Sequence, residues 1–165
     1  MSDSSEKARE LRAQLIRNWD EVPRETLERA PRFASCFASL AAGTAARKLG
    51  ASVDTVPPGS TSCPYHYHLA QEEMFVLLQG EGTLRVAGER LAVRAGDVIF
   101  IPSGPVYPHH LINTSQAPLT YLSIGTQERP EICGYPDSGK LYASHPGARL
   151  LQKPENNLDY WEGEG

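Results

Sequence analysis

The stretch that decides the fold is CPYHYHLAQEEMFVLLQGEG, which runs from Cys63 to Gly82. It places His66 and His68 one residue apart, follows them with Glu72 and Glu73, and continues as an apolar run that ends at glycine. On a β-strand, residues i and i+2 point to the same face. The two imidazoles therefore face one side of the predicted strand, as a shared metal ion requires.

Two apolar runs further along the chain predict buried strands. EMFVLLQ (73–79) and DVIFIP (97–102) do not alternate between apolar and polar residues. Such runs indicate strands with both faces buried. One face would line a closed interior, and the N-terminal segment, the C-terminal tail or a second subunit would cover the other. Short runs divided by turn signals such as QGEG, AGER and PSGP predict an all-β sandwich or barrel.

Bulk composition limits the classes of partner. The 165 residues fit one domain, and 16 Lys and Arg against 20 Asp and Glu give a net charge of −4. No basic cluster favours nucleic acid, and the charged N-terminus favours neither a signal peptide nor a membrane span. The three cysteines show no CxxC spacing, so we expect a cytoplasmic protein.

Helix periodicity is confined to the N-terminus. Apolar positions spaced three or four apart predict a short amphipathic helix from Ser4 to Asn18, with residues 1–32 forming that helix and a proline-punctuated connector. The barrel core is expected over 33–125. We expect residues 126–165 to form a loop-rich extension that packs on the barrel or on a partner subunit. The runs KLYAS and ARLLQ in this extension resemble short strands.

A second histidine cluster offers further ligands. Glu73 follows the HxH pair after a bend of four residues, so its carboxylate can come from the next strand. The run PHHLIN, with His109 and His110, can supply a third imidazole from a later strand. Imidazole with carboxylate suits Fe, Mn, Ni, Zn or Cu, and the donor types alone do not choose among them.

These residues resemble the two motifs of the cupin superfamily, and the wider chain is similar to small single-domain bacterial cupins. Gly59 to Gly80 resembles the first motif, and the family's spacing selects Glu73 rather than Glu72. Gly96 to Asn113 resembles the second motif, in which His109 has the position of the metal histidine. The spacer between Gly59 and His66 and the loop between Gly104 and His109 are both longer than in the usual family pattern.

The resemblance implies a double-stranded β-helix, or jelly-roll barrel, with an interior divalent transition metal (Fe, Mn, Zn or Ni). The ligands that it implies are His66, His68, Glu73 and His109. Four protein ligands on an octahedral ion leave two adjacent positions for water, a bidentate substrate or O₂, as a catalytic site requires. A metal-free cupin that keeps the barrel is the alternative.

Strand parity extends the prediction to the surroundings of the ion. Glu72 and His110 should face away from it and lie behind the ligands, although ligation by His110 stays open. The residues that parity turns inward should form a mainly apolar pocket. Its walls would contain Phe75, Leu77, Gln79 and Leu111, and Tyr107 would lie at its mouth. Cys63 is interpreted as an apolar filler. No catalytic triad and no lone general base stand out.

The leading hypothesis is a metal-binding cupin that acts on a small metal-chelating organic molecule. The preferred reaction is a dioxygenase-type oxidation with Fe(II), and the second choice is isomerisation or decarboxylation with Mn(II). The alternative is a non-catalytic module that binds or senses a small metabolite, and a third hypothesis is a metal-free structural homodimer. A homodimer is expected in each case, with a small-molecule ligand and without nucleic acid or membrane.

Overall fold

The chain folds almost entirely into antiparallel β-structure. A computed structural model describes residues 5–165, so the predicted helix start at Ser4 lies outside the described residues. The strands are β1 (Glu25–Arg29), β2 (Phe33–Ser39), β3 (Leu49–Val56), β4 (Tyr67–His68), β5 (Glu73–Gln79), β6 (Glu81–Val86), β7 (Glu89–Arg94), β8 (Val98–Ile101), β9 (His109–Ile112), β10 (Leu119–Thr126), β11 (Glu131–Tyr135), β12 (Lys140–His145) and β13 (Ala148–Gln152). A short helix α1 (Glu6–Leu15) precedes them, and a 3₁₀ turn (Pro154–Asn156) follows.

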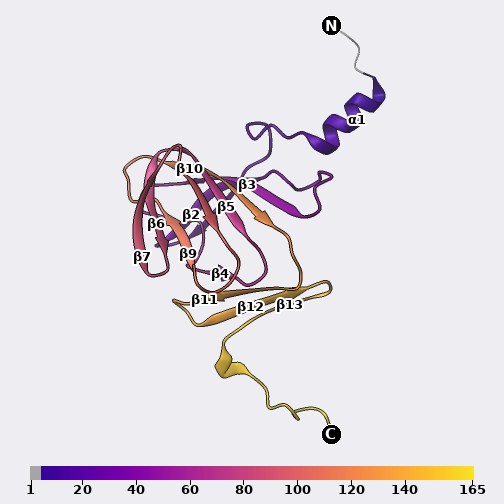
Figure 1. Ribbon diagram of the computed structural model, residues 1–165, viewed down its shortest axis with the longest axis vertical. Coiled ribbons are helices and arrows are strands. Elements are labelled where there is room, and N and C mark those ends of the chain that lie inside the picture. Colours follow the sequence, from indigo (N-terminus) through magenta and orange to yellow (C-terminus); the bar gives the residue numbers. More distant parts are fainter. Residues whose placement is uncertain (1–4) are drawn as a thin grey trace.

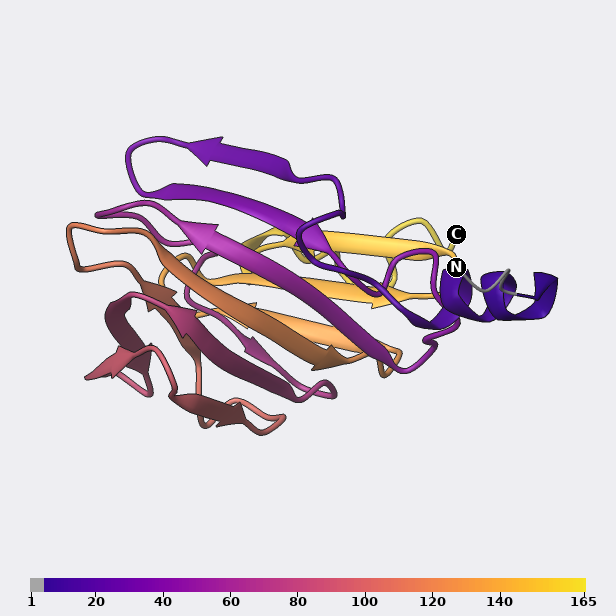
Figure 2. The same cartoon turned by 90° about the horizontal axis from the view of Figure 1, so that it is seen from above.

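The strands form three sheets (Figures 1 and 2). Their orders are β1-β2-β3-β10-β5-β8, β7-β6-β9 and β13-β12-β11-β4. The hydrophobic core takes its side chains from both of the first two sheets, with Leu77 and Tyr121 from one and Leu84 and Leu111 from the other. This arrangement confirms the predicted all-β jelly roll.

The N-terminal helix forms, but none of its residues is buried. Its N-cap is Ser5, whose hydroxyl accepts a hydrogen bond from the backbone N–H of Ala8 at 3.2 Å. Leu11 and Leu15 are 45% and 63% exposed, and α1 projects away from the sheets (Figure 1). The connector after it contains β1, which the sequence did not predict because only Leu27 of this edge strand is even half-buried.

The outer face of β8 is open in a single copy of the chain. The sequence predicted both faces to be buried, but Val98 is 47% exposed and Phe100 is 72% exposed. Val98 and Phe100 alternate with Ile99 and Ile101, which pack in the core, so the two exposed side chains lie on the opposite face of the sheet. Neither terminal segment of residues 5–165 covers it.

The C-terminal part is more ordered than its loop-rich sequence indicated. The strand-like pieces KLYAS and ARLLQ lie in β12 and β13, and the four-stranded sheet that they form lies across one end of the barrel (Figure 1). β11 joins this sheet to β4 through the pairs Cys133↔His68 and Gly134↔Tyr67. The tail beyond β13 is not docked on the barrel, because Tyr160 and Trp161 are 82% and 73% exposed.

Among residues 5–165, the helices are too short and too polar for any of them to span a membrane.

Candidate metal centre

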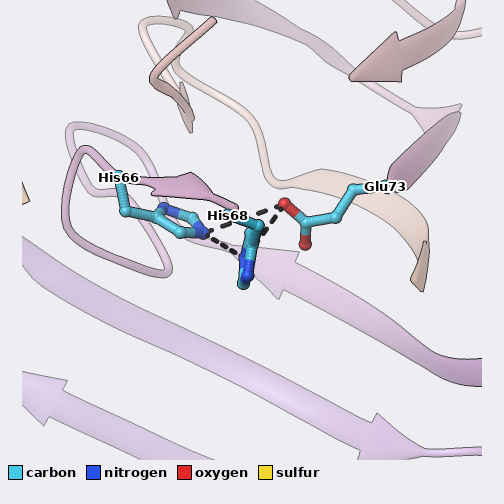
Figure 3. Close-up of side chains that lie close together, drawn as sticks. All are labelled: His66, His68 and Glu73. Atoms are coloured by element: carbon cyan, nitrogen blue, oxygen red, sulfur yellow. Dashed lines mark hydrogen bonds and ion pairs between the residues drawn. The ribbon is translucent and has the colours of Figure 1, made fainter. Parts of the chain in front are cut away.

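Strand pairing brings the two histidine clusters together. His66 and His109 form an antiparallel bridge, in which the N–H of His66 donates to the carbonyl of His109 at 3.1 Å and the reverse bond is 2.7 Å long. His68 lies two residues further along on β4, and Glu73 is the first residue of β5. The period-two alternation of strands thus directs His66 and His68 toward Glu73, as expected (Figure 3).

Three imidazoles converge on one carboxylate oxygen, Oε2 of Glu73. Oε2 of Glu73 lies 2.9 Å from Nε2 of His109, 3.4 Å from Nε2 of His68 and 3.8 Å from Nε2 of His66. The Nε2 atoms of His66 and His68 are 3.1 Å apart. The structure therefore gathers all four residues that the family resemblance implied as ligands.

The other ring nitrogen of each histidine faces an acceptor. Nδ1–H of His66 donates to the carbonyl of Pro64 at 2.9 Å, and Nδ1–H of His109 donates to the carbonyl of Tyr107 at 3.1 Å. Nδ1 of His68 lies 3.2 Å from the thiol sulfur of Cys133. A proton held on Nδ1 leaves the lone pair on Nε2, the tautomer in which histidine binds metals.

This arrangement of lone pairs fits a divalent cation. Nε2 of each of the three histidines lies 2.9 to 3.8 Å from Oε2 of Glu73, and the shortest of these contacts is a hydrogen bond that Nε2–H of His109 donates to the carboxylate. An imidazole lone pair and a carboxylate repel each other unless a proton or a metal ion lies between them, and a bound divalent ion would replace the proton that His109 and Glu73 share. Neutral imidazole with carboxylate is the donor set of the divalent transition metals.

Burial controls the charge of the cluster. It lowers the pKa of His66 to about 4, so this imidazole stays neutral at physiological pH. Burial alone would raise the pKa of Glu73, but the hydrogen bond from His109 and the charges of the surrounding histidines lower it. The resting site thus holds one carboxylate and at least one neutral imidazole, which are ready to bind a cation.

A buried carboxylate behind His68 was missed by the sequence reasoning. Glu131, on β11, is 3% exposed, and its Oε1 lies 3.5 Å from Nδ1 of His68. The thiol of Cys133 contacts the same Nδ1 and donates to Glu131 at 4.0 Å. The spacing of Glu131 and Cys133, two residues apart, was the available signal that both face one side of a strand.

The two residues predicted to lie behind the ligands differ in their surroundings. The side chain of Glu72 is exposed, and only its backbone is engaged, by Thr126. His110 is half-buried against the ring of Tyr65, and its Nδ1 lies 3.3 Å from the carbonyl of Cys63. Burial lowers the pKa of His110.

A cavity of about 290 Å³ borders the cluster and includes His66, Glu73 and His109 in its wall. Phe75 and Leu111 line it, as predicted by parity. The structure places the other three predicted pocket residues elsewhere, namely Leu77 in the core, and Gln79 and Tyr107 on the surface. For Gln79 the cause is local: it is the last residue of β5, and the β5–β10 register shifts beside its partner.

Further polar groups of the cavity come from residues that the sequence reasoning did not select. Asp54 and Tyr121 lie opposite each other on β3 and β10, and both line the cavity. Ser52 donates a hydrogen bond to Asp54 at 2.6 Å, and Ser62 is hydrogen-bonded to the hydroxyl of Tyr121 at 2.6 Å. The walls are therefore more polar than the predicted apolar pocket.

Comparison with known proteins identifies the family. Residues 52–125 match the family model described as "Cupin domain", which confirms the resemblance seen in the motifs. Residues 52–125 therefore form a cupin domain.

Two proteins of known sequence resemble part of this chain, and one solved structure shares its fold. An uncharacterised protein of Methanocaldococcus jannaschii is 35% identical over 97 residues, which cover 59% of this chain and 64% of that protein. An oxalate-binding protein of Thermotoga maritima is 36% identical over 69 residues, or 42% of this chain and 54% of that protein. The chain thus spans less than two thirds of each relative. In structure, a putative sugar phosphate isomerase from Acidithiobacillus ferrooxidans shares the fold, with a TM-score of 0.76 at 23% identity over 85% of this chain and 90% of that one.

Proposed function

We propose that this chain binds a divalent transition metal through His66, His68, Glu73 and His109, and acts on a small organic molecule that chelates the ion through two oxygens. The observation that supports the proposal is the convergence of three Nε2 atoms on Oε2 of Glu73 while each Nδ1 faces its own partner. A bound ion would supply Lewis-acid chemistry, with Fe, Mn, Zn and Ni as the candidates.

The protein residues prepare the site for this chemistry. The Nδ1 contacts fix the three ring planes, so little rearrangement is needed when a ligand arrives. Phe75 and Leu111 keep one wall of the cavity apolar, which limits the water that can enter beside the substrate. The cavity of about 290 Å³ limits the substrate to a small molecule.

Two neighbouring glutamates provide a matched test of the metal site. Glu73 faces the histidines, whereas the side chain of Glu72 is exposed. Glu73→Gln should lower Mn²⁺ or Zn²⁺ affinity at least tenfold, because it removes the charged ligand, and Glu72→Gln should leave it unchanged. Elemental analysis of untagged protein complements the titration. Absence of metal in the wild type, before and after titration with Mn, Fe, Ni and Zn, would refute the proposal.

The class of reaction is decided by separate assays. Oxidation of a dioxygenase type with Fe(II) is measured as oxygen uptake with small diols and keto acids. Isomerisation or decarboxylation with Mn(II) is followed by NMR of the same panel without oxygen. The fold shared with a putative sugar phosphate isomerase is compatible with the second class.

Non-catalytic binding of a small metabolite is the second candidate function. It is favoured by the relative from Thermotoga maritima that is named an oxalate-binding protein. In this case metal-loaded protein would bind members of the panel and release them unchanged. Turnover of any of them would exclude a purely binding role.

A homodimer in a reducing, cytoplasmic setting completes the proposal. The exposed apolar face of β8, with Val98 and Phe100, supports a second copy of the chain as its cover. Cys36, Cys63 and Cys133 are free thiols, in keeping with a reducing compartment. A strictly monomeric species in sedimentation at micromolar concentration would refute the dimer.

A further inference from the structure

Asp54 is a buried carboxylate with few partners. It lies within β3, its side chain faces the cavity, and 9% of it is exposed. The hydroxyl of Ser52 donates to it at 2.6 Å. Within residues 5–165 this is its one hydrogen bond, and no basic side chain lies within ion-pair distance of it.

The fold gives no reason for a carboxylate at this position. Its cross-strand neighbours are Phe37 and Tyr121, so an apolar side chain would suit the interior better. An ionised carboxylate accepts about four hydrogen bonds, and Asp54 receives one. Burial raises its pKa, and the hydrogen bond from Ser52 opposes that rise only in part. Groups held in such unfavourable surroundings are concentrated at functional sites.

Asp54 shares its cavity with the metal cluster but is separate from it. His66, Glu73 and His109 line the same space, and no hydrogen bond or ion pair in the described part of the chain joins any of them to Asp54. A ligand chelated at the cluster would therefore present its free end to the remaining walls. There it meets Asp54, Tyr121, His110, Cys63 and serine hydroxyls.

We propose that Asp54 binds the free end of the ligand and selects small hydroxylated acids over dicarboxylates. This inference rests on the metal site of the proposed function. The ligand class has a carboxylate with an adjacent hydroxyl or carbonyl oxygen for the ion, and a further hydroxyl that donates to Asp54. A dicarboxylate such as oxalate presents only acceptor oxygens at its free end, and the Asp54 carboxylate repels them.

Three probes separate these contributions. Glycerate and lactate offer the same chelating pair, but glycerate ends in a hydroxyl and lactate in a methyl group. Oxalate also chelates through two oxygens, and its free end carries two acceptor oxygens. The binding of each probe to Mn²⁺-loaded protein is measured by calorimetry at pH 7 for the wild type, Asp54→Asn and Asp137→Asn. Asp137 is an exposed control, since it pairs with Arg85 on the surface.

The expected results run in opposite directions for the two kinds of probe. The wild type and Asp137→Asn should prefer glycerate to lactate about tenfold or more, the value of one hydrogen bond to a charged group. Asp54→Asn should reduce this preference to about threefold or less, since a neutral acceptor binds a hydroxyl more weakly. It should also bind oxalate at least about tenfold more tightly, because the charge is gone and the amide donates. Tighter binding cannot result from a folding defect.

Metal content measured on the same samples distinguishes the two levels of the proposal. If Asp54→Asn holds Mn²⁺ like the wild type and changes neither the glycerate preference nor the oxalate affinity, the role of Asp54 is refuted and the metal site stands. A metal-loaded wild type that binds none of the three probes also refutes the assigned ligand class. A wild type that binds no metal overturns the proposed function and this inference with it.

Discussion

The orientation of His68 depends on Glu131, and this dependence can be tested with one conservative change. The carboxylate of Glu131 accepts the backbone N–H groups of Leu69 at 3.0 Å, Ala70 at 3.2 Å and Gln71 at 2.9 Å. It also lies 3.5 Å from Nδ1 of His68. Glu131→Gln keeps the shape of the side chain, but it removes the charge and replaces one oxygen by a donor.

The structure allows the cost to be worked out. The amide oxygen can occupy the position of Oε2 and keep the bonds from Ala70 and Gln71. Hydrogen bonds to a charged group contribute about 1.5–3 kcal/mol and neutral ones about 0.5–1.5, so the two bonds lose about 2–3 kcal/mol together. Leu69 keeps the carbonyl of Ile132 at 2.9 Å. His68 loses its carboxylate, and loss of such a group behind a ligand typically lowers metal affinity about 10- to 100-fold.

Two measurements separate support of the fold from orientation of the ligand. Competition with a chromophoric chelator gives the Zn²⁺ or Mn²⁺ affinity, and urea unfolding of metal-free protein gives the stability. Glu128→Gln is the matched control, because this exposed carboxylate lies three residues earlier. If Glu131→Gln unfolds more easily but binds metal like the wild type, Glu131 supports only the loop, and the reasoning on His68 is refuted.

Three further predictions concern the stability of the metal-free protein in urea. Asp54→Asn should raise the free energy of unfolding at pH 7, because burial raises the pKa of Asp54 and the ionised form is therefore destabilising. The difference in stability should disappear as the pH falls from the folded-state pKa toward 3.8, the ordinary value of an aspartate side chain. An equal stability at pH 7 would contradict this. Gly134→Ala should cost about 1–3 kcal/mol, because its Cβ would overlap the ring of Tyr67, and a second change, Tyr67→Ala, should recover most of the loss. Asn113→Ala should cost roughly 2–4 kcal/mol, since the buried amide donates to the carbonyl of Val56 at 2.8 Å and accepts a backbone N–H at 3.0 Å; a loss below about 1 kcal/mol would show that water replaces these bonds.

The ligand cluster could be predicted because its geometry follows from short-range rules. The HxH pair and Glu73 lie within eight residues, and strand parity fixes which side chains share a face. His109 was predictable only from its resemblance to a second motif. Its contact with Glu73 at 2.9 Å depends on the pairing of strands that lie far apart in the sequence.

The surroundings of the cluster could not be predicted, because they depend on register between distant strands. Asp54 lies in the unremarkable run ASVDTV, and only the pairing of β3 with β10 shows that it faces the cavity. Strand parity also placed Gln79 wrongly in the pocket wall, because a register shift and the end of β5 interrupt the alternation of side chains. Long-range pairing of this kind leaves no local pattern in the sequence.

The C-terminal sheet belongs to the site, although the family match ends at residue 125. β4 has only two residues, and within the described chain its strand partner is β11. That strand supplies Glu131 and Cys133 behind His68, and Glu131 also holds the backbone of residues 69–71 that leads into Glu73. Two of the four candidate ligands therefore depend on a strand outside the matched region. A boundary at residue 125 separates the region matched by the family model from its extension, but it divides the candidate metal site.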